Sequence, residues 1–318
     1  MEDIMVEILW QGFLLVVGFV MLIKGADWFV EGASKIADKF GIPQLVIGLT
    51  IVAMGTSAPE AAVSITSALK GSAEITIGNV VGSNILNVLI ILGLTAVVRA
   101  IAVQKSTVKY EIPFTILITV LLAVLGLADN TISRVEGIIL WVFMIIYLLY
   151  LLRMAKNGQN VTEEVEKADA NDPMWKLLLL VVVGVVAIVW GSDITVNAAT
   201  ALAKIFGMSE RLIGLTIVAL GTSLPELVTS VTAAIKGKAD IAVGNIVGSN
   251  IFNILFVVGT TALITPVAYS ASFMVDSIVA AAAMLLLLIC IIPKKKLARP
   301  AGALLLVCYV GYFIYLIQ

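Results

Sequence analysis

Long apolar stretches separated by short polar ones run the whole length of the chain. A membrane-spanning helix needs about 20 apolar residues. Ten stretches approach or exceed that length, at roughly residues 7–38, 43–70, 73–98, 107–127, 132–154, 173–206, 209–236, 239–264, 270–292 and 300–317. The first and sixth are longer than an upright crossing requires, so we expect them to tilt or to extend beyond the bilayer. The pattern predicts an all-α membrane protein with ten transmembrane helices.

The composition is typical of a protein surrounded by lipid. Of the 318 residues, 61% are hydrophobic and 13% are charged, and the mean hydropathy is +1.11. Soluble domains are about 45–50% apolar and about 25% charged. A net charge of −1 gives no basic footprint for nucleic acid. Histidine is absent and no nucleophile–base pair is evident, which argues against an enzyme. Cys290 and Cys308 lack metal-ligand spacing, and no cofactor is expected.

Lysine and arginine are unevenly distributed among the predicted loops. With the N-terminus outside, fifteen of these 20 residues lie at the inner ends of spans and four at the outer ends. Because inner loops are enriched in positive charge, we expect a multi-pass protein of the cell membrane with both termini extracellular.

The acidic start, Met1-Glu2-Asp3, does not favour a cleaved signal peptide. The polar segment 155–172 lacks the ligand spacing of an EF-hand, so it is interpreted as a solvated cytoplasmic linker and not as a calcium loop.

The sequence repeats itself at an offset of 166 residues. GLTIVAMGTSAPE (48–60) and GLTIVALGTSLPE (214–226) share eleven of 13 positions, and GNVVGSNILN (78–87) matches GNIVGSNIFN (244–253). Each copy holds five spans, an odd number, so the second copy must enter the membrane from the opposite side. Inverted repeats of this kind are a recurring architecture of secondary transporters, with the substrate held at the repeat interface.

The expected organisation follows from this repeat. Two inverted five-helix repeats, 1–154 and 173–318, are joined by the linker 155–172. The repeated motifs lie at 48–93 and 214–259. Helices 2, 3, 7 and 8 are expected to be broken and to meet at the centre.

The motif predicts a break inside the second span. Pro59 has no N–H, and its ring collides with the carbonyl of Gly55 four residues back. In lipid, a broken helix is tolerated where it lines a cavity. Its free carbonyls, the Thr56 and Ser57 hydroxyls and the Glu60 carboxylate are oxygen ligands of the kind that hard cations prefer. The second copy repeats every element, with Gly221, Thr222, Ser223, Pro225 and Glu226.

The two glutamates are the strongest functional candidates. A carboxylate at the bilayer centre costs about 2.5–3.5 kcal/mol and usually marks an ion or proton path. We expect Glu60 and Glu226 to face each other, so that one divalent cation neutralises both. The motif offers no nitrogen or sulfur ligand, which disfavours zinc and copper. The alternative is structural, with proline as a kink and glutamate as a buried hydrogen-bonding partner; two complete copies make it the weaker reading.

The next spans supply further polar oxygen atoms. Ser83 and Asn87 are one turn apart on the same helical face, and they recur as Ser249 and Asn253. We expect these four residues to complete the cation site, with helix packing as the alternative. Packing is the favoured role for Asn84 and Asn250, which lie on another face.

Two aspartates also match across the repeat, Asp27 and Asp193. Lys24 lies one turn from Asp27, and we predict a structural ion pair between them. No lysine occupies the corresponding place in the second copy, so Lys24 is not part of the repeated pattern.

The paired motifs resemble a known family. GTS-x-PE followed by GN-x-x-GSN-x-x-N, present twice, is similar to the alpha repeats of the sodium/calcium exchanger family within the cation/calcium antiporter superfamily. The resemblance covers nearly the whole chain. It implies a compact microbial member without the large cytoplasmic calcium-sensing domains of animal exchangers. It also implies that spans one and six slide past a rigid core of the other eight helices.

The resemblance further implies a cluster of cation sites in which calcium and sodium share Glu60 and Glu226. Calcium would also bind the backbone carbonyls of Thr56 and Thr222. The remaining implied ligands are Ser57, Ser83 and the Ala53 carbonyl for one flanking sodium ion, Ser223, Ser249 and the Ala219 carbonyl for the other, and Asn87 and Asn253 in the middle. Some microbial members carry Asp at the position of Asn253. This chain therefore has two site acids, which leaves the ion stoichiometry open.

The expected function is secondary antiport of sodium against calcium by alternating access. The expected partners are the two ions and the lipid bilayer, and a monomer is expected to suffice. Calcium/proton exchange on the same fold is the alternative, and a cation channel is a third possibility. The proton-coupled branch typically has Asn where this chain has Thr56 and Thr222, so the hydroxyl-rich motif favours sodium.

Overall fold

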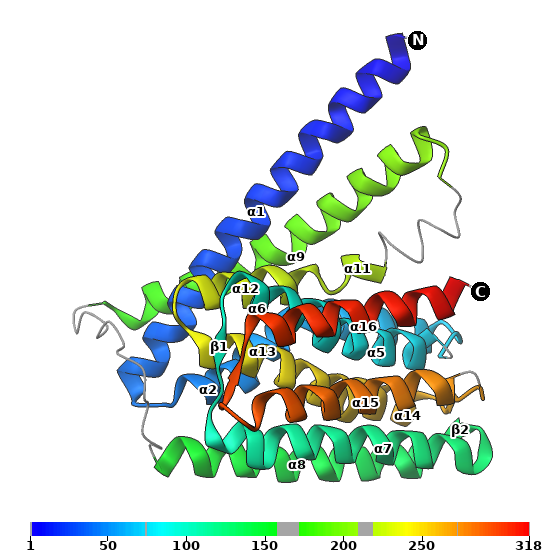
Figure 1. Ribbon diagram of the computed structural model, residues 1–318. Helices are drawn as coiled ribbons and strands as arrows, with labels where there is room; N and C mark the ends of the chain where they lie inside the picture. Colours follow the sequence, from blue (N-terminus) through cyan, green and yellow to red (C-terminus); the bar gives the residue numbers. More distant parts are fainter. Residues whose placement is uncertain (1, 74, 158–171, 209–218, 272, 318) are drawn as a thin grey trace.

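The computed structural model describes residues 2–73, 75–157, 172–208, 219–271 and 273–317, and within these ranges nearly all of the chain is helical (Figure 1). The first half contains α1 (Glu2–Phe40), α2 (Gln44–Ile47), η1 (Gly48–Val52), α3 (Ala53–Thr56), α4 (Ala58–Leu69), α5 (Ile75–Leu86), η2 (Asn87–Leu92), α6 (Gly93–Val98), η3 (Thr107–Glu111), α7 (Ile112–Asp129) and α8 (Arg134–Asn157). The second half contains α9 (Met174–Ile205), α11 (Ala219–Gly221), α12 (Leu224–Ile235), α13 (Ala239–Phe252), η5 (Asn253–Val258), α14 (Gly259–Ile264), α15 (Phe273–Ile291) and α16 (Arg299–Ile317). The η segments are π-helical turns.

Membrane-spanning helices make up most of the described chain. Eight helices there are long and apolar enough to cross a bilayer, and a ninth span results if the bent pair Gln44–Thr56 and Ala58–Leu69 is counted as one. The expected span 209–236 is described only from residue 219, and its helix α12 is apolar but shorter. The prediction of an all-α membrane protein is confirmed.

Two of the four expected helix breaks are present and two are not. The second span bends by 48° between Thr56 and Ala58, and Ser223 has nearly the same backbone angles (φ −92°, ψ 3°) as Ser57 (φ −85°, ψ 7°). The expectation of breaks in spans three and eight is wrong, because Ile75–Val98 and Ala239–Ile264 each run through as one helix. Neither contains proline, and a π-helical turn that begins at an asparagine accommodates the polar residues without interrupting the helix.

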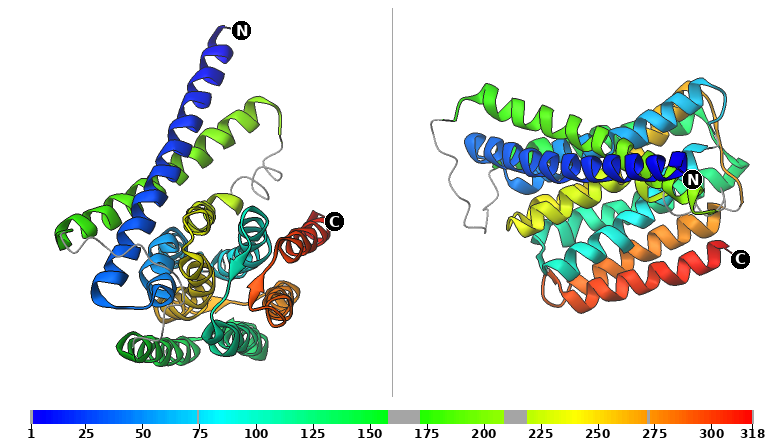
Figure 2. Two further views of the ribbon diagram at one scale, coloured as in Figure 1. Left: turned by 60° about the vertical axis from the view of Figure 1, so that its left-hand side comes forward. Right: turned by 90° about the horizontal axis from the view of Figure 1, so that it is seen from above.

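The two uninterrupted central helices form the core of the molecule. Of the most apolar 18-residue window in each, 94% is buried for Ala239–Ile264 and 78% for Ile75–Val98, whereas the value for α16 is 11%. Helices α7, α8, α15 and α16 lie around this centre (Figures 1 and 2). The lipid-facing helices therefore shield a centre whose helices can carry polar groups.

Helices α1 and α9 form a separate pair that lies obliquely across the other helices (Figures 1 and 2). Glycines bring their backbones together at two levels. A Cβ atom on Gly184 would lie 2.8 Å from the Gly25 carbonyl oxygen, and one on Gly191 would lie 2.9 Å from that of Gly18. Small residues allow such close helix approach in membranes, so α1 and α9 are expected to move as one body.

Two short antiparallel pairs tie the halves of the chain together at opposite ends. Strand β1 (Ile101–Ala102) pairs with β4 (Lys296–Leu297), and β2 (Thr131–Ile132) pairs with β3 (Val267–Ala268). Arginine side chains reinforce both ends. Arg299 donates to the Val98 carbonyl at the end of α6 (3.3 Å), and Arg134 donates to the Ile264 carbonyl at the end of α14 (3.2 Å). Each connection joins one half of the chain to the other.

The segment that precedes α9 is also tied to α1. Lys35 on α1 lies 3.0 Å from the Asp172 carboxylate, and Lys176 on α9 lies 3.2 Å from it. The hydrogen bonds from Lys35 and Lys176 lower the pKa of the Asp172 carboxyl. The rest of the predicted linker lies outside the described residues.

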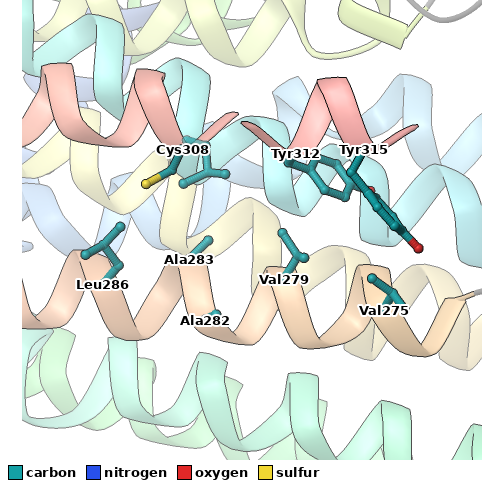
Figure 3. A pocket seen from close by; sticks show the side chains of 9 residues that line it. Val275, Val279, Ala282, Ala283, Leu286, Cys308, Tyr312 and Tyr315 are labelled. Carbon is teal, nitrogen blue, oxygen red and sulfur yellow. The ribbon is translucent and has the colours of Figure 1, made fainter. Parts of the chain in front are cut away.

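A shallow apolar groove separates α15 from α16 (Figure 3). Val275, Val279, Ala283 and Leu286 face Cys308 and Tyr312 across it. The Tyr312 hydroxyl donates to the Asp276 carboxylate (2.8 Å), which satisfies the polar atoms at this edge. The groove is lined mainly by apolar side chains and contains none of the residues predicted to bind cations.

Candidate functional site

Both glutamates of the repeated motif lie at the start of a helix, in the middle of the protein. Pro59 and Pro225 occupy the first turns of α4 and α12, where a missing N–H costs no hydrogen bond. Glu60 and Glu226 follow directly, where the positive end of the helix dipole favours a carboxylate. Their exposed fractions are 1% and 0%. The break thus positions two buried acids at two helix N-termini.

The Glu226 carboxylate is bound by hydroxyl groups from both halves of the chain. Ser57 donates to Glu226 Oε1 at 2.7 Å, and Ser249 lies 3.5 Å from the same oxygen. Ser83 is the neighbouring hydroxyl of Glu60, and the Glu60 and Glu226 carboxylates are close enough for their charges to repel each other. The structure therefore brings together both glutamates and three of the predicted serines.

Threonine and backbone oxygens extend this cluster. The Thr56 hydroxyl donates to Asn245 Oδ1 at 2.9 Å and lies 3.3 Å from the Ala53 carbonyl. The same carbonyl accepts a hydrogen bond from Ser249 (3.4 Å). Ala53, Thr56 and Ser249 are all buried. The Thr56 hydroxyl and the Ala53 carbonyl of the first motif therefore contact residues of the second copy that lie beside Glu226.

Asn79 and Asn245 hold the backbone beside each glutamate. Asn79 donates to the Glu60 carbonyl (3.2 Å) and to Ser64 (2.9 Å). Asn245 makes the matching bonds to the Glu226 carbonyl (3.3 Å) and to Ser230 (2.9 Å). Ser64 and Ser230 were not among the predicted site residues. The 166-residue offset could have identified them, because it relates Ser64 to Ser230 and each lies four residues after its glutamate.

Four asparagines join the two central helices. Asn84 donates to the Asn250 carbonyl (3.2 Å), and Asn250 donates back to the Asn84 carbonyl (3.3 Å). Asn87 donates to Asn250 Oδ1 (3.0 Å), and Asn253 donates to Asn84 Oδ1 (3.2 Å). All four side chains are buried. Asn84 and Asn250 thus occupy the helix-packing positions expected of them, and they orient Asn87 and Asn253.

Buried acceptor oxygens without a hydrogen-bond donor collect at this place. Glu60 Oε2, Glu226 Oε2, Asn87 Oδ1 and Asn253 Oδ1 have no partner among the described residues. An unsatisfied buried polar group costs about 1–3 kcal/mol, and an unpaired buried carboxylate costs more. The described residues contain no group of three or more Asp, Glu, His or Cys side chains that could hold a metal. The arrangement is thus a two-acid, all-oxygen site with free acceptors.

The remaining predicted ligands are less engaged. Ser223 is buried, and its hydroxyl has no hydrogen-bond partner among the described residues. Thr222 is half-buried. Ala219 begins the short helix α11, and its side chain lies outside the described set. Among the described residues, Ser223 and Thr222 therefore make fewer hydrogen bonds in the site than Ser57 and Thr56.

The ion pair predicted within α1 is corrected by the structure. Asp27 pairs with Lys236, at 2.6 Å between Oδ1 and Nζ, and Lys24 forms no ion pair within the described ranges. Lys236 follows the last turn of α12, and α1 packs against that helix. Asp27 therefore pairs with a lysine that follows another helix, and not with Lys24 in its own helix.

The comparisons with known proteins agree with this geometry. The profile of the sodium/calcium exchanger protein family matches residues 10–153 and 176–318. The putative antiporter CaxA of Alkalimonas amylolytica is 43% identical over 306 residues, which cover 94% of this chain and 96% of the relative. The sodium/calcium exchanger MaX1 of Methanosarcina acetivorans is 33% identical, with coverage of 95% and 97%.

A solved structure also supports membership of this family. The sodium-calcium exchanger NCX_Mj without sodium and calcium superposes with a TM-score of 0.83 at 31% identity, over 97% of this chain and 99% of the other. The family profile, the relatives and the fold agree over nearly the full length. The chain is therefore a compact member of the sodium/calcium exchanger family, a multi-pass membrane protein of the cation/calcium antiporter type.

Proposed function

We propose that this protein exchanges sodium for calcium across the cell membrane at the site around Glu60 and Glu226. The observation that carries the proposal is the set of four buried acceptor oxygens for which the described residues provide no donor, two of them carboxylate oxygens. Bound cations satisfy these acceptors and neutralise both charges. Calcium is coordinated by six to eight oxygens, which the carboxylates, carbonyls, hydroxyls and water can supply.

The ligands are assigned from the resemblance of the motifs to those of the family. Calcium binds between Glu60 and Glu226 with the carbonyls of Thr56 and Thr222. Sodium ions occupy overlapping places on either side, and Asn87 and Asn253 lie in the middle. The flanking sodium ligands are Ser57, Ser83 and the Ala53 carbonyl on one side, and Ser223, Ser249 and the Ala219 carbonyl on the other. The hydroxyls and carbonyls favour sodium over protons as the coupled ion, since protons need no such coordination shell.

We further propose that ten transmembrane helices form two inverted five-helix repeats. The 166-residue offset carries β1 onto β3 and β2 onto β4, so that each two-stranded pair contains one strand from each copy. The reciprocal bonds between Asn84 and Asn250 follow the same relation. The two separate segments matched by the family profile also support a division into two repeats.

Antiport follows from the charge of the site. Loaded with cations, the site is close to neutral and can be covered by the apolar pair α1 and α9. An empty site keeps two buried negative charges, and covering it is penalised. Exchange is therefore favoured over leak. If more than two sodium ions replace one calcium, transport moves net charge and responds to voltage by about 2.3 kcal/mol per charge per 100 mV.

The proposed coupling predicts that sodium drives calcium movement. In proteoliposomes at clamped pH, an outwardly directed sodium gradient should accelerate calcium uptake several-fold over sodium-free vesicles. The same vesicles loaded with potassium serve as the control. Calcium uptake that follows a pH gradient and ignores sodium would replace sodium with protons in the proposal, and uptake without saturable counterflow would indicate a channel.

The proposed orientation places both termini outside the cell. It agrees with the pairing of β1 with β4, because both flanking loops are assigned to the inner side. In a background with Cys290→Ser and Cys308→Ser, an impermeant thiol reagent added to intact cells should label a Lys70→Cys variant and spare a Lys295→Cys variant. Both lysines are exposed in the structure. The reverse labelling pattern would invert the topology.

A further inference from the structure

An ion pair attaches the α1–α9 helix pair to the core. Within the described ranges, the residues at the equivalent positions of the other repeat do not form the corresponding ion pair. Lys236 Nζ lies 2.6 Å from Asp27 Oδ1 and donates to the Asp27 backbone carbonyl at 3.2 Å. The 166-residue offset carries Asp27 onto Asp193 in α9 and relates Lys236 to Lys70, the residue that follows α4. Both members of this second pair are exposed, and in the described part of the chain they form no ion pair with each other.

The same asymmetry between the two copies is present inside the proposed cation site. Thr56 donates to Asn245, and Ser57 donates to Glu226. The hydroxyl of Ser223, which is the counterpart of Ser57, is buried and has no partner in the ranges that the structure describes. Helix α1 packs against α12, whereas α9 has no comparable contact with α4. Contacts between α1 or the first motif and the second copy are therefore formed. The related contacts of Ser223 and α9 are not formed within the described part of the chain.

The close contacts between α1 and α9 couple the two aspartates mechanically. The backbones touch at Gly25 with Gly184 and at Gly18 with Gly191, which places Asp27 and Asp193 on one body. Lys70 and Lys236 follow α4 and α12, at the opposite ends of the core in the proposed orientation. In an inverted repeat, the second state arises when the two copies exchange conformations. In that state Asp193 forms an ion pair with Lys70, as Asp27 does with Lys236 in this structure.

We infer that Asp27–Lys236 and Asp193–Lys70 are alternate latches of the transport cycle. The first holds the inner side closed in the state described here, and the second forms when the α1–α9 pair has moved and closes the outer side. Only one latch is formed at a time. This inference rests on the proposed alternating access between two inverted repeats, and it does not depend on which ion is coupled to calcium.

Neutralising one lysine should shift the balance between the two states. The contact is partly exposed, with 30% of the Lys236 side chain and 38% of the Asp27 side chain accessible. Loss of such a pair changes a two-state population by about two- to fivefold. Lys236→Met should therefore raise the half-saturating calcium concentration on the outer face and lower it on the inner face. Lys70→Met should do the opposite, and the double variant should return close to wild type.

Two further variants separate a latch from a general effect on the protein. Lys294→Met removes an exposed lysine that forms no ion pair among the described residues, and it should leave the ratio of the two half-saturating concentrations unchanged. The exchanged pair Asp27→Lys with Lys236→Asp should restore the wild-type ratio. Shifts of the same sign for Lys236→Met and Lys70→Met, or no shift in either, would overturn the proposal.

A measurement without transport keeps the latch distinct from the proposed function. Cysteines at 70 and 193, in a background with Cys290→Ser and Cys308→Ser, can be joined by a short bifunctional thiol reagent in membranes. Adding Lys236→Met should raise the yield of cross-linking about two- to fivefold, whereas adding Lys294→Met should not. An unchanged yield with Lys236→Met would rule out the latch even if calcium flux is normal. A raised yield would support it even if sodium proves not to be coupled.

Discussion

Glu226→Gln should reduce calcium flux at least about 100-fold, equivalent to about 2.7 kcal/mol in binding or in the barrier. The substitution keeps the shape of the side chain, but it removes one of the two charges that balance a divalent ion. Ligand charge is a main determinant of calcium affinity. Glu60→Gln should have a comparable effect, because both carboxylates carry an acceptor oxygen with no donor among the described residues.

Folding should survive these substitutions. A glutamine avoids the cost of burying an ionised carboxylate, so the melting temperature of the purified variants without calcium should equal or exceed that of wild type. Calcium should also stabilise wild type more than either variant, because a ligand that binds the folded state raises its stability. Glu7→Gln, on the exposed first part of α1, is the matched control and should transport normally. Full calcium flux in Glu60→Gln or Glu226→Gln would remove the basis of the proposed function.

Gly184→Val should reduce transport at least about tenfold while the core remains folded. A Cβ atom at this position would lie 2.7 Å from the Phe29 backbone nitrogen and 2.8 Å from the Gly25 carbonyl oxygen, both of which belong to α1. The two helices must separate to accommodate it, and overpacking of this kind costs about 1–3 kcal/mol. Because movement of the pair is proposed to expose the site, a separated pair should slow exchange more than it lowers calcium affinity.

The measurement is initial calcium flux per molecule together with calcium binding to purified protein. Gly12→Val provides the control in the same helix α1, because a Cβ atom there would meet nothing within 4 Å. It should leave both quantities unchanged. Normal flux in Gly184→Val would show that the contact between α1 and α9 is not needed for transport, and it would weaken the case for their joint movement.

Much of the fold could be predicted from the sequence because lipid imposes simple rules. Apolar length located the spans, and Pro59 and Pro225 located the bends, since proline removes a helix hydrogen bond wherever it stands. The expected breaks in spans three and eight were wrong for a related reason. Polar residues alone do not interrupt a helix, and the π-helical turns at Asn87 and Asn253 keep the backbone hydrogen-bonded.

The site was predictable in its membership but not in its asymmetry. The offset identified Ser57 and Ser223 as equivalent, and nothing in the sequence distinguishes them. Only the structure shows that Ser57 contacts the opposite glutamate while the hydroxyl of Ser223 has no partner among the residues described. The partner of Asp27 was missed for a similar reason. Lys236 is 209 residues from Asp27 in the sequence, so no local spacing relates the two. Under the proposed movement of α1 and α9, this contact also belongs to only one of the conformations that the sequence encodes.

The two-stranded pairs at the ends of the molecule bear on how such a protein could originate. Each pair takes one strand from each half, and the offset relates Leu297 in β4 to Thr131 in β2. Consider a half-length chain that carries both β1 and β2, and a second, identical chain inserted in the opposite orientation. The β1 strand of each chain could pair with the β2 strand of the other. A homodimer of half-length chains would form the same two strand pairs, so fusion of two gene copies needs no new interface to give the present chain.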